Sequence, residues 1–193
     1  MSDEPCGCAP IEVEDEALFE DALHLCARCH GVSRQDILEG LRQGDPRLHS
    51  SLRYGLAKGV SKYLGSLGSS FREVYVRGSA AGQRANPASD IDVIVVVRKR
   101  RDEVLRLLGL LDILVTARYR DLIGFTGRLC SLLDIQVVED ETSVGNAGRS
   151  AVLGGLNTRP ICLWRSSPEE ATGASLRGSP RQSSPEIAST TRY

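Results

Sequence analysis

The amino-acid sequence predicts one α/β (α+β) domain, a small mixed sheet flanked by helices with a helical extension at the N-terminus. Three segments with helical periodicity precede the first strand, and residues 91–97 form a β-branched run that is apolar on both faces. With 193 residues, 41% of them hydrophobic, the chain suits one domain better than two. We divide it into an acidic, cysteine-bearing extension over residues 1–45, a globular domain over 46–165 and a disordered tail over 166–193.

The N-terminal part of the chain has the spacing of three helices. Residues 14–29 place their small and apolar side chains on one stripe. Ser33 and Asp36 have the spacing of a capping box, which predicts the start of a second, short helix. Asp45 followed by Pro46 supplies an N-cap and a proline at the first position of a longer helix, which runs to about residue 66.

The remaining elements alternate between strands and one long helix. Residues 74–76, 91–97 and 132–138 read as strands, and a last short strand is expected at 160–164. Residues 102–129 are mostly compatible with a helix, although Leu111 to Val115 suit a short strand equally well. Beyond Ser166 the chain is rich in Ser, Pro, Thr and Gly and has almost no large apolar residue, which predicts disorder.

Charge is distributed unevenly along the chain. The first 21 residues carry eight acidic residues and neither Lys nor Arg, so 24 basic residues face 17 acidic ones in the rest. A basic body favours an anionic substrate such as a nucleotide or a nucleic acid. No segment has the roughly 18 to 20 consecutive apolar residues of a membrane span, and the acidic N-terminus is unlike a signal peptide. We therefore expect no membrane association and a cytoplasmic location.

One segment carries the residue types of a metal and nucleotide site. Gly78 and Ser79 follow the first strand, and Asp90 and Asp92 open the next one. If these strands are antiparallel, the Gly-Ser loop and the two carboxylates meet at one edge of the sheet. Residues two apart on a strand face the same side, so Asp90 and Asp92 can bind divalent cations together, while glycine lets a phosphate approach the backbone.

This segment resembles the signature of the DNA polymerase β-like nucleotidyltransferase superfamily, in which Gly-Ser is followed after about ten residues by Asp-x-Asp. It is most similar to the minimal nucleotidyltransferases, the small stand-alone members, over roughly residues 50–165. The resemblance implies the nucleotidyltransferase fold, with the triphosphate bound by Gly78 and Ser79 and Mg²⁺ bound by Asp90 and Asp92. Arg84 is a further candidate contact to the nucleotide.

The family also uses a third carboxylate on a neighbouring strand. The better match is Asp134 in the segment Leu-Leu-Asp-Ile-Gln-Val-Val, which an adjacent strand would bring across from the Asp pair. Asp112 in Leu-Leu-Asp-Ile-Leu-Val is the second candidate. With the third carboxylate, the predicted catalytic and Mg²⁺-binding set is Asp90, Asp92 and Asp134.

The resemblance also implies an activity, the transfer of a nucleoside monophosphate from an NTP to a hydroxyl or phosphate acceptor, with ATP as the expected donor. Small stand-alone members are similar to antitoxins that modify a HEPN-type toxin, so a partner protein is the first expected acceptor. Antibiotic-modifying and RNA-tailing enzymes are the other branches, and a nucleic-acid partner stays open. The alternative is a non-catalytic module that binds nucleotide or zinc on the same fold.

Four cysteines near the N-terminus form a second candidate site. Cys6 and Cys8 are one residue apart, and Cys26 and Cys29 have two residues between them. If the N-terminal arm folds back, these thiols can bind Zn²⁺ in a tetrahedral site. Cys26 and Cys29 also lie on the apolar stripe of the first predicted helix, so buried free thiols are the competing interpretation.

Overall fold

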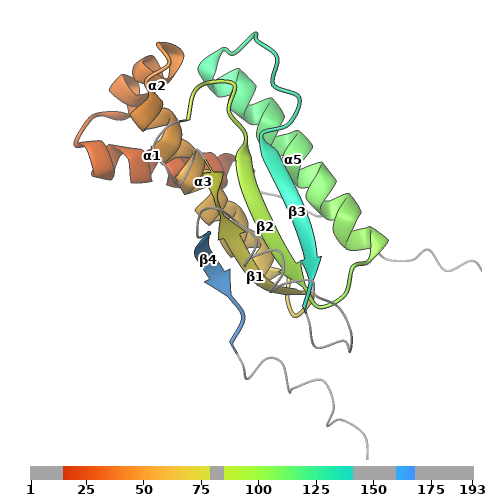
Figure 1. Ribbon diagram of the computed structural model, residues 1–193. Helices are drawn as coiled ribbons and strands as arrows, with labels where there is room; N and C mark the ends of the chain where they lie inside the picture. The colour runs from red at the N-terminus through yellow and green to blue at the C-terminus, as the bar shows by residue number, and fades with distance from the viewer. Residues whose placement is uncertain (1–14, 79–84, 141–159, 168–193) are drawn as a thin grey trace, which may run out of the picture.

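The computed structural model describes residues 15–78, 85–140 and 160–167 (Figure 1). Its elements follow the expected order of three helices, two strands, a helix and two strands. They are α1 (Asp15–His30), α2 (Arg34–Arg42), α3 (Pro46–Ser66), β1 (Phe71–Val76), β2 (Ile91–Val97), α5 (Asp102–Ile123), β3 (Leu133–Glu139) and β4 (Ile161–Arg165).

The four strands form one mixed sheet in the order β3-β2-β1-β4. Strand β1 is antiparallel to both β2 and β4, whereas β2 and β3 are parallel. The parallel pair is joined through α5, which is the crossover that such a pair needs. This arrangement confirms the predicted fold class of a small mixed sheet flanked by helices.

Helices α3 and α5 pack against one face of the sheet (Figure 1). Alternate β2 residues Val93, Val95 and Val97 belong to the large core shared with these helices. The β2 residues between them, Ile94 and Val96, form a second buried cluster on the other face. Both faces of β2 are therefore apolar and buried, as the uninterrupted run of β-branched residues predicted.

The N-terminal helices share the core of the sheet-bearing part. Phe19 and Cys26 of α1 and Ile37 of α2 are at most 2% exposed and belong to the same apolar cluster as α3. A Cβ atom on Gly55 of α3 would lie only 2.9 Å from the backbone of Ala22, so glycine is what allows α1 to cross so closely. The division proposed at residue 45 stays a prediction.

Local signals set the helix boundaries. The Ser33 side chain accepts from the backbone N–H of Asp36, and the Asp36 side chain accepts from that of Ser33, which completes the predicted capping box. Asp45 caps α3 and Pro46 opens it, as predicted. The segment 111–115 is helical, which decides between the two interpretations left open, and α5 ends at Gly124, which has φ +64°.

In the part of the chain that the structure describes, none of the helices combines the length and the apolar character needed to cross a membrane.

Candidate active site

Two of the predicted carboxylates are brought together by strand pairing. Asp92 on β2 and Asp134 on β3 are register partners in the parallel ladder, where neighbouring strands lie about 4.8 Å apart. Asp90 lies two residues before Asp92, at the entry to β2, and its side chain is exposed. The strand pairing thus brings all three acids to one edge of the sheet.

These carboxylates lie on the sheet face opposite the helices. Ile91 and Val93 belong to the core shared with α3 and α5, so Asp92 between them points to the other side. Parallel register partners point to the same side, which gives Asp134 the same face. The described helices that contact the sheet, α3 and α5, pack on the opposite face (Figure 1).

Gly78 is pressed against Asp92. Its φ is +71°, a backbone conformation that side-chain-bearing residues rarely adopt, and a Cβ there would overlap with Oδ2 of Asp92. The chain reaches this point because the β1–β2 ladder pairs Val76 with Val93 and Arg77 donates its backbone N–H to the Asp92 carbonyl at 3.0 Å. A side chain at position 78 would have to displace the Asp92 carboxylate. The backbone of Gly78 and the position of this carboxylate therefore depend on each other.

Arg77 adds a positive charge to the site, which sequence reasoning missed. Its Nη2 lies 3.4 Å from Oδ1 of Asp92, and both side chains are partly buried. Arg77 directly precedes Gly78, so an arginine at the end of the strand beside the Gly-Ser pair was the signal available. The ion pair holds the Asp92 carboxylate in place.

The environment of Asp92 disfavours its negative charge. Burial is the main cause that raises the pKa of this carboxyl, and the neighbouring carboxylates of Asp90 and Asp134 raise it further. Arg77 acts in the opposite direction and lowers the pKa. The net direction is upward, so the surroundings of Asp92 disfavour its negative charge and a bound cation would favour it.

The donor set fits Mg²⁺ by its chemistry, since Mg²⁺ prefers carboxylate oxygens. The side-chain positions do not yet form a coordination sphere: among residues 15–78, 85–140 and 160–167, no three His, Cys, Asp or Glu side chains are grouped to hold a metal ion. In the described structure Asp92 pairs with Arg77 instead. The carboxylates that Mg²⁺ prefers are therefore near one another, but their side chains are not arranged around a common metal position.

A fully buried arginine holds the loop that leads to the carboxylates. Arg53 on α3 is 0% exposed. Its Nε and Nη2 donate to the Ser89 carbonyl at 3.1 and 2.9 Å, and Nη2 also donates to the Pro87 carbonyl at 3.1 Å. On the same helix the Ser50 hydroxyl accepts from the backbone N–H of Ala85 at 3.0 Å. Helix α3 thus fixes the segment just before Asp90 at three backbone positions.

His49 and Tyr119 complete this buried network. Nε2 of His49 lies 2.9 Å from the Leu41 carbonyl, which only accepts, so Nε2 carries the proton and Nδ1 is an acceptor. Arg53 and the Tyr119 hydroxyl both lie 3.0 Å from Nδ1. Burial, followed by the charge of Arg53, lowers the pKa of His49 to about 4, so the imidazole is neutral at physiological pH. The sequence offered only a His-x-x-x-Arg spacing as a signal.

Asp112 has a structural role in the helix rather than a place on a strand beside the Asp pair. It lies in α5, and its Oδ1 accepts from the backbone N–H groups of Leu132 and Leu133 at 3.1 and 2.8 Å. The Thr116 hydroxyl donates to the same carboxylate at 3.0 Å and accepts from Leu132 at 2.7 Å. Together they fix the start of β3, and with it the position of Asp134.

The other predicted site residues divide between described and undescribed parts of the chain. Cys26 is buried in the core, where burial raises the pKa of its thiol to about 12, and this disfavours the thiolate that zinc needs. Cys29 is exposed, although it was expected on the apolar stripe, because it lies about 60° around the helix from Cys26. The candidates Ser79, Arg84, Cys6 and Cys8 lie outside the described residues.

Comparison with known proteins finds a family match that spans this site. Residues 57–144 match the model of a family described as nucleotidyltransferase domain, a range that includes Gly78 and the three aspartates. No curated protein and no solved structure matches the chain. The family supports transferase activity in general, the transfer of nucleoside monophosphates. Over residues 57–144 the chain is therefore similar to the nucleotidyltransferase domain family.

Proposed function

We propose that this protein is a Mg²⁺-dependent nucleotidyltransferase that moves AMP from ATP to a hydroxyl of a partner protein. The observation that carries the proposal is the pairing of Asp92 with Asp134 beside the Gly78 turn. A partly buried carboxylate beside two others is stabilised by a bound cation, and transfer from an NTP needs such a cation. When bound, Mg²⁺ supplies charge neutralisation on the phosphates and lowers the pKa of the attacking hydroxyl.

The transfer forms one bond and breaks one. The acceptor oxygen forms a bond to the α-phosphorus, the bond from that phosphorus to the bridging oxygen breaks, and pyrophosphate leaves with the electron pair. Asp90 and Asp92 would hold the Mg²⁺, and Asp134 would complete its ligand set or accept the hydroxyl proton. Gly78 leaves room beside Asp92 for phosphate oxygens, and Arg77 offers a cation next to them.

In this proposal Arg53 is a positioning residue. It touches neither nucleotide nor metal, but its hydrogen bonds to the Pro87 and Ser89 carbonyls set the course of the backbone into Asp90. Burial lowers the pKa of its guanidinium, and the nearby negative charge of Asp90 acts in the opposite direction. The buried network thus links the first metal ligand to the rigid frame of α3.

A protein acceptor follows from the likeness to antitoxin-type members, whose partners are HEPN-type toxins. The carboxylates lie on a sheet face that no described helix covers, and this leaves room for a macromolecular acceptor. The acceptor class is the part of the proposal that only an experiment with candidate partners decides.

The test is incubation with each of the four α-³²P-labelled NTPs and Mg²⁺, with and without the protein products of neighbouring genes. Asp90→Asn plus Asp92→Asn is compared with Asp121→Asn, which removes an exposed carboxylate on α5. We expect label from ATP on a partner, with at least a 100-fold loss in the double variant and full activity in the control. ATP binding without any label transfer would contradict the enzymatic proposal and favour the non-catalytic nucleotide-binding module.

A further inference from the structure

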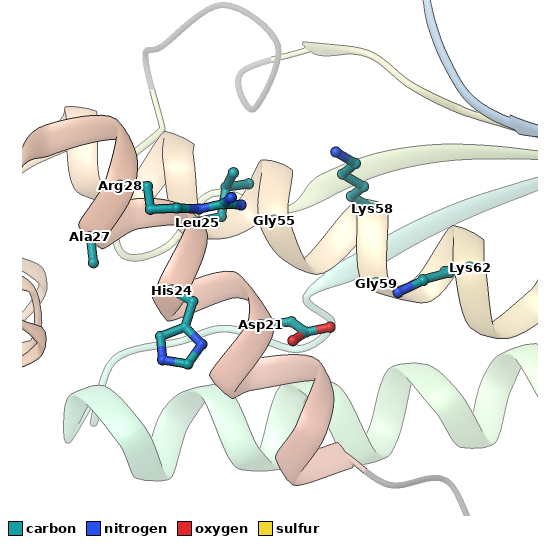
Figure 2. A pocket seen from close by; sticks show the side chains of 9 residues that line it. All are labelled: Asp21, His24, Leu25, Ala27, Arg28, Gly55, Lys58, Gly59 and Lys62. Carbon is teal, nitrogen blue, oxygen red and sulfur yellow. The ribbon is translucent and has the colours of Figure 1, made fainter.

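A pocket of about 550 Å³ lies between α1 and α3, and basic side chains surround it (Figure 2). Helix α1 contributes His24 and Arg28, and α3 contributes Lys58 and Lys62. Asp21 is the single carboxylate that lines it. Three permanent cations therefore face one anion around a space large enough for a small ligand.

The hollow follows from the way the two helices cross. Gly55 and Gly59 of α3 also line the pocket, and they carry no side chain where α1 passes. A Cβ on Gly59 would lie 2.9 Å from Cδ2 of Leu18, and one on Gly55 would lie 2.9 Å from Ala22. Helix α1 is therefore close to α3 at both glycines, through the backbone of Ala22 at Gly55 and the side chain of Leu18 at Gly59, and the longer side chains of both helices line the pocket beside this contact.

The cations of this pocket have no carboxylate partner in the described parts of the chain. None of the ion pairs found there involves Arg28, Lys58 or Lys62. The neighbouring acids of α1 pair elsewhere, Glu20 with Arg34 at 2.6 Å and Glu16 with Arg118 at 3.6 Å. Among the described residues, Asp21 is thus the carboxylate left to offset the three cations of the pocket, and no ion pair joins it to them.

The use of lysine here is selective. The chain has only three lysines, and two of them, Lys58 and Lys62, line this pocket, one helical turn apart on α3. Lysine is a flexible point charge with three donors, which suits phosphate oxygens in several arrangements. Among the described residues no Phe, Tyr or Trp lines the pocket and His24 is its one ring, so we expect a ligand to be recognised mainly by its phosphates.

The pocket is separate from the carboxylate site. Helix α3 turns by roughly 100° per residue, which places Lys58 and Lys62 about 140° and 180° around the helix from Arg53. Arg53 faces the loop before Asp90, whereas the lysines face α1. A ligand between α1 and α3 would therefore bind on the opposite side of the helix that supports the carboxylates.

We propose that this pocket binds a small ligand of the oligophosphate class through Arg28, Lys58 and Lys62. The ligand can be a free oligophosphate or the phosphate chain of a nucleotide, since both present the same oxygens to the three cations. Phosphate binding in this pocket requires no catalysis at Asp90 or Asp92, so it can be tested independently of the transfer reaction.

The test is calorimetric titration of the full chain with sodium tripolyphosphate, in EDTA and at low salt. Without a divalent cation the three aspartates repel the anion, which leaves the pocket as the binding place. We compare the native chain with Lys58→Gln plus Lys62→Gln, in which glutamine keeps the helix propensity. The matched control is Lys99→Gln, which removes the third lysine, an exposed one after β2. We expect at least ten-fold weaker binding in the double variant and less than a two-fold change in the control.

Further arms decide where the phosphate binds and from which source it comes. Asp90→Asn plus Asp92→Asn should bind tripolyphosphate at least as tightly as the native chain, whereas a loss there would assign the anion to the carboxylate site and overturn the proposal. Equal binding by the native and lysine variants would overturn it as well, as would no binding at all. ATP in place of tripolyphosphate shows whether a nucleotide is the source. Binding of oligothymidylate but not tripolyphosphate would indicate a nucleic-acid surface instead and contradict the proposal.

Discussion

At the scale of single residues, the contact between Gly78 and Asp92 is the tightest constraint on the site. Gly78 has a positive φ, which disfavours any residue with a side chain. The Asp92 carboxylate also occupies the space that a side chain at Gly78 would need. The proposed metal ligand Asp92 and the backbone turn at Gly78 thus constrain each other directly. The same closeness explains why a Gly-Ser turn and an Asp-x-Asp strand occur together in one motif.

Gly78→Ala should abolish nucleotide transfer and lower stability by about 1 to 2 kcal/mol. The new methyl group must displace the Asp92 carboxylate, while the positive φ adds backbone strain. Label transfer and urea unfolding measure the two effects. Gly31→Ala is the matched control, because Gly31 has φ +66° and no atom lies within 4 Å of the place its new methyl group would take. It should show a similar stability cost with activity retained, and equal activity losses in both variants would contradict the role given to the contact.

At the scale of elements, α3 organises the site although it contributes no ligand to it. One side of the helix holds residues 85–90 through Ser50 and Arg53, and another side receives α1 through glycines. Helix α5 acts similarly on β3, where Asp112 and Thr116 bind the backbone before Asp134. The three carboxylates are therefore positioned by helices packed on the far side of the sheet.

Arg53→Lys should lower kcat at least ten-fold and raise the Mg²⁺ concentration needed for half-maximal activity, with a small change in KM for ATP. A lysine can no longer bridge the Pro87 and Ser89 carbonyls, so Asp90 loses its fixed approach. Steady-state kinetics across a Mg²⁺ titration give the three parameters. Arg47→Lys, an exposed change on the same helix, should be silent. A fall in stability without a shift of the Mg²⁺ midpoint would reduce Arg53 to a purely structural residue.

The buried imidazole of His49 should make stability fall as the pH drops from about 6.5 to about 4. Burial and the charge of Arg53 lower the pKa of His49 to about 4 in the folded chain. In this pH range the imidazole is therefore protonated in the unfolded chain but neutral in the folded one. Tyr119 and Asp45 are the other titratable groups near this imidazole. The loss should reach at most about 3 kcal/mol and level off below pH 4. Urea unfolding at several pH values measures it. His49→Gln should remove this component, and His24→Gln, at an exposed position, should keep it; identical pH profiles for native and His49→Gln would contradict the assignment.

The sequence predicted the elements well because most boundaries depend on local signals. Asp45-Pro46 and the Ser33–Asp36 capping box determine where helices begin, and the β-branched run determines β2. The ambiguous segment 111–115 could not be decided in this way, because leucine, isoleucine and valine suit a buried helix and a strand alike. Its helical state depends on packing against the sheet, which is a tertiary property.

The candidate site was predictable only in its carboxylates. The proximity of Asp92 and Asp134 follows from the pairing of β2 with β3. The sequence predicts it because both strands are recognisable there and alternate residues of a strand point to the same face. Arg53 lies beside the apolar stripe of α3, and nothing in its local sequence indicates that a guanidinium is fully buried there. Its role depends on carbonyl groups more than thirty residues away, so only the three-dimensional structure reveals it.

At the scale of the whole molecule, a mainly apolar core supports an edge of concentrated negative charge. The raised pKa of Asp92 means that the folded chain holds this proton to a higher pH than the unfolded chain does, so stability declines as the pH rises through that range. Arg77 offsets this repulsion only in part, because the pKa of Asp92 stays raised despite the ion pair. A divalent cation at the carboxylates should therefore stabilise the entire fold.

Addition of 10 mM Mg²⁺ at pH 7 should raise the thermal unfolding midpoint by a few degrees, as expected for a ligand with a millimolar Kd, which contributes about 1.4 kcal/mol. The effect should weaken as the pH falls, because protonation of Asp92, whose pKa is raised by burial, removes the charge that binds the cation. Differential scanning calorimetry measures it, with NaCl at equal ionic strength as the control. A shift of equal size in Asp90→Asn plus Asp92→Asn would place the cation elsewhere.

The most direct test of the account is an anomalous-scattering map from crystals of the full chain grown with Mn²⁺ and a non-hydrolysable ATP analogue. The account predicts a Mn²⁺ peak within about 2.5 Å of carboxylate oxygens of Asp90 and Asp92, next to the phosphates and beside Asp134. A nucleotide bound without metal at these aspartates, or a Mn²⁺ peak at another place, would contradict it.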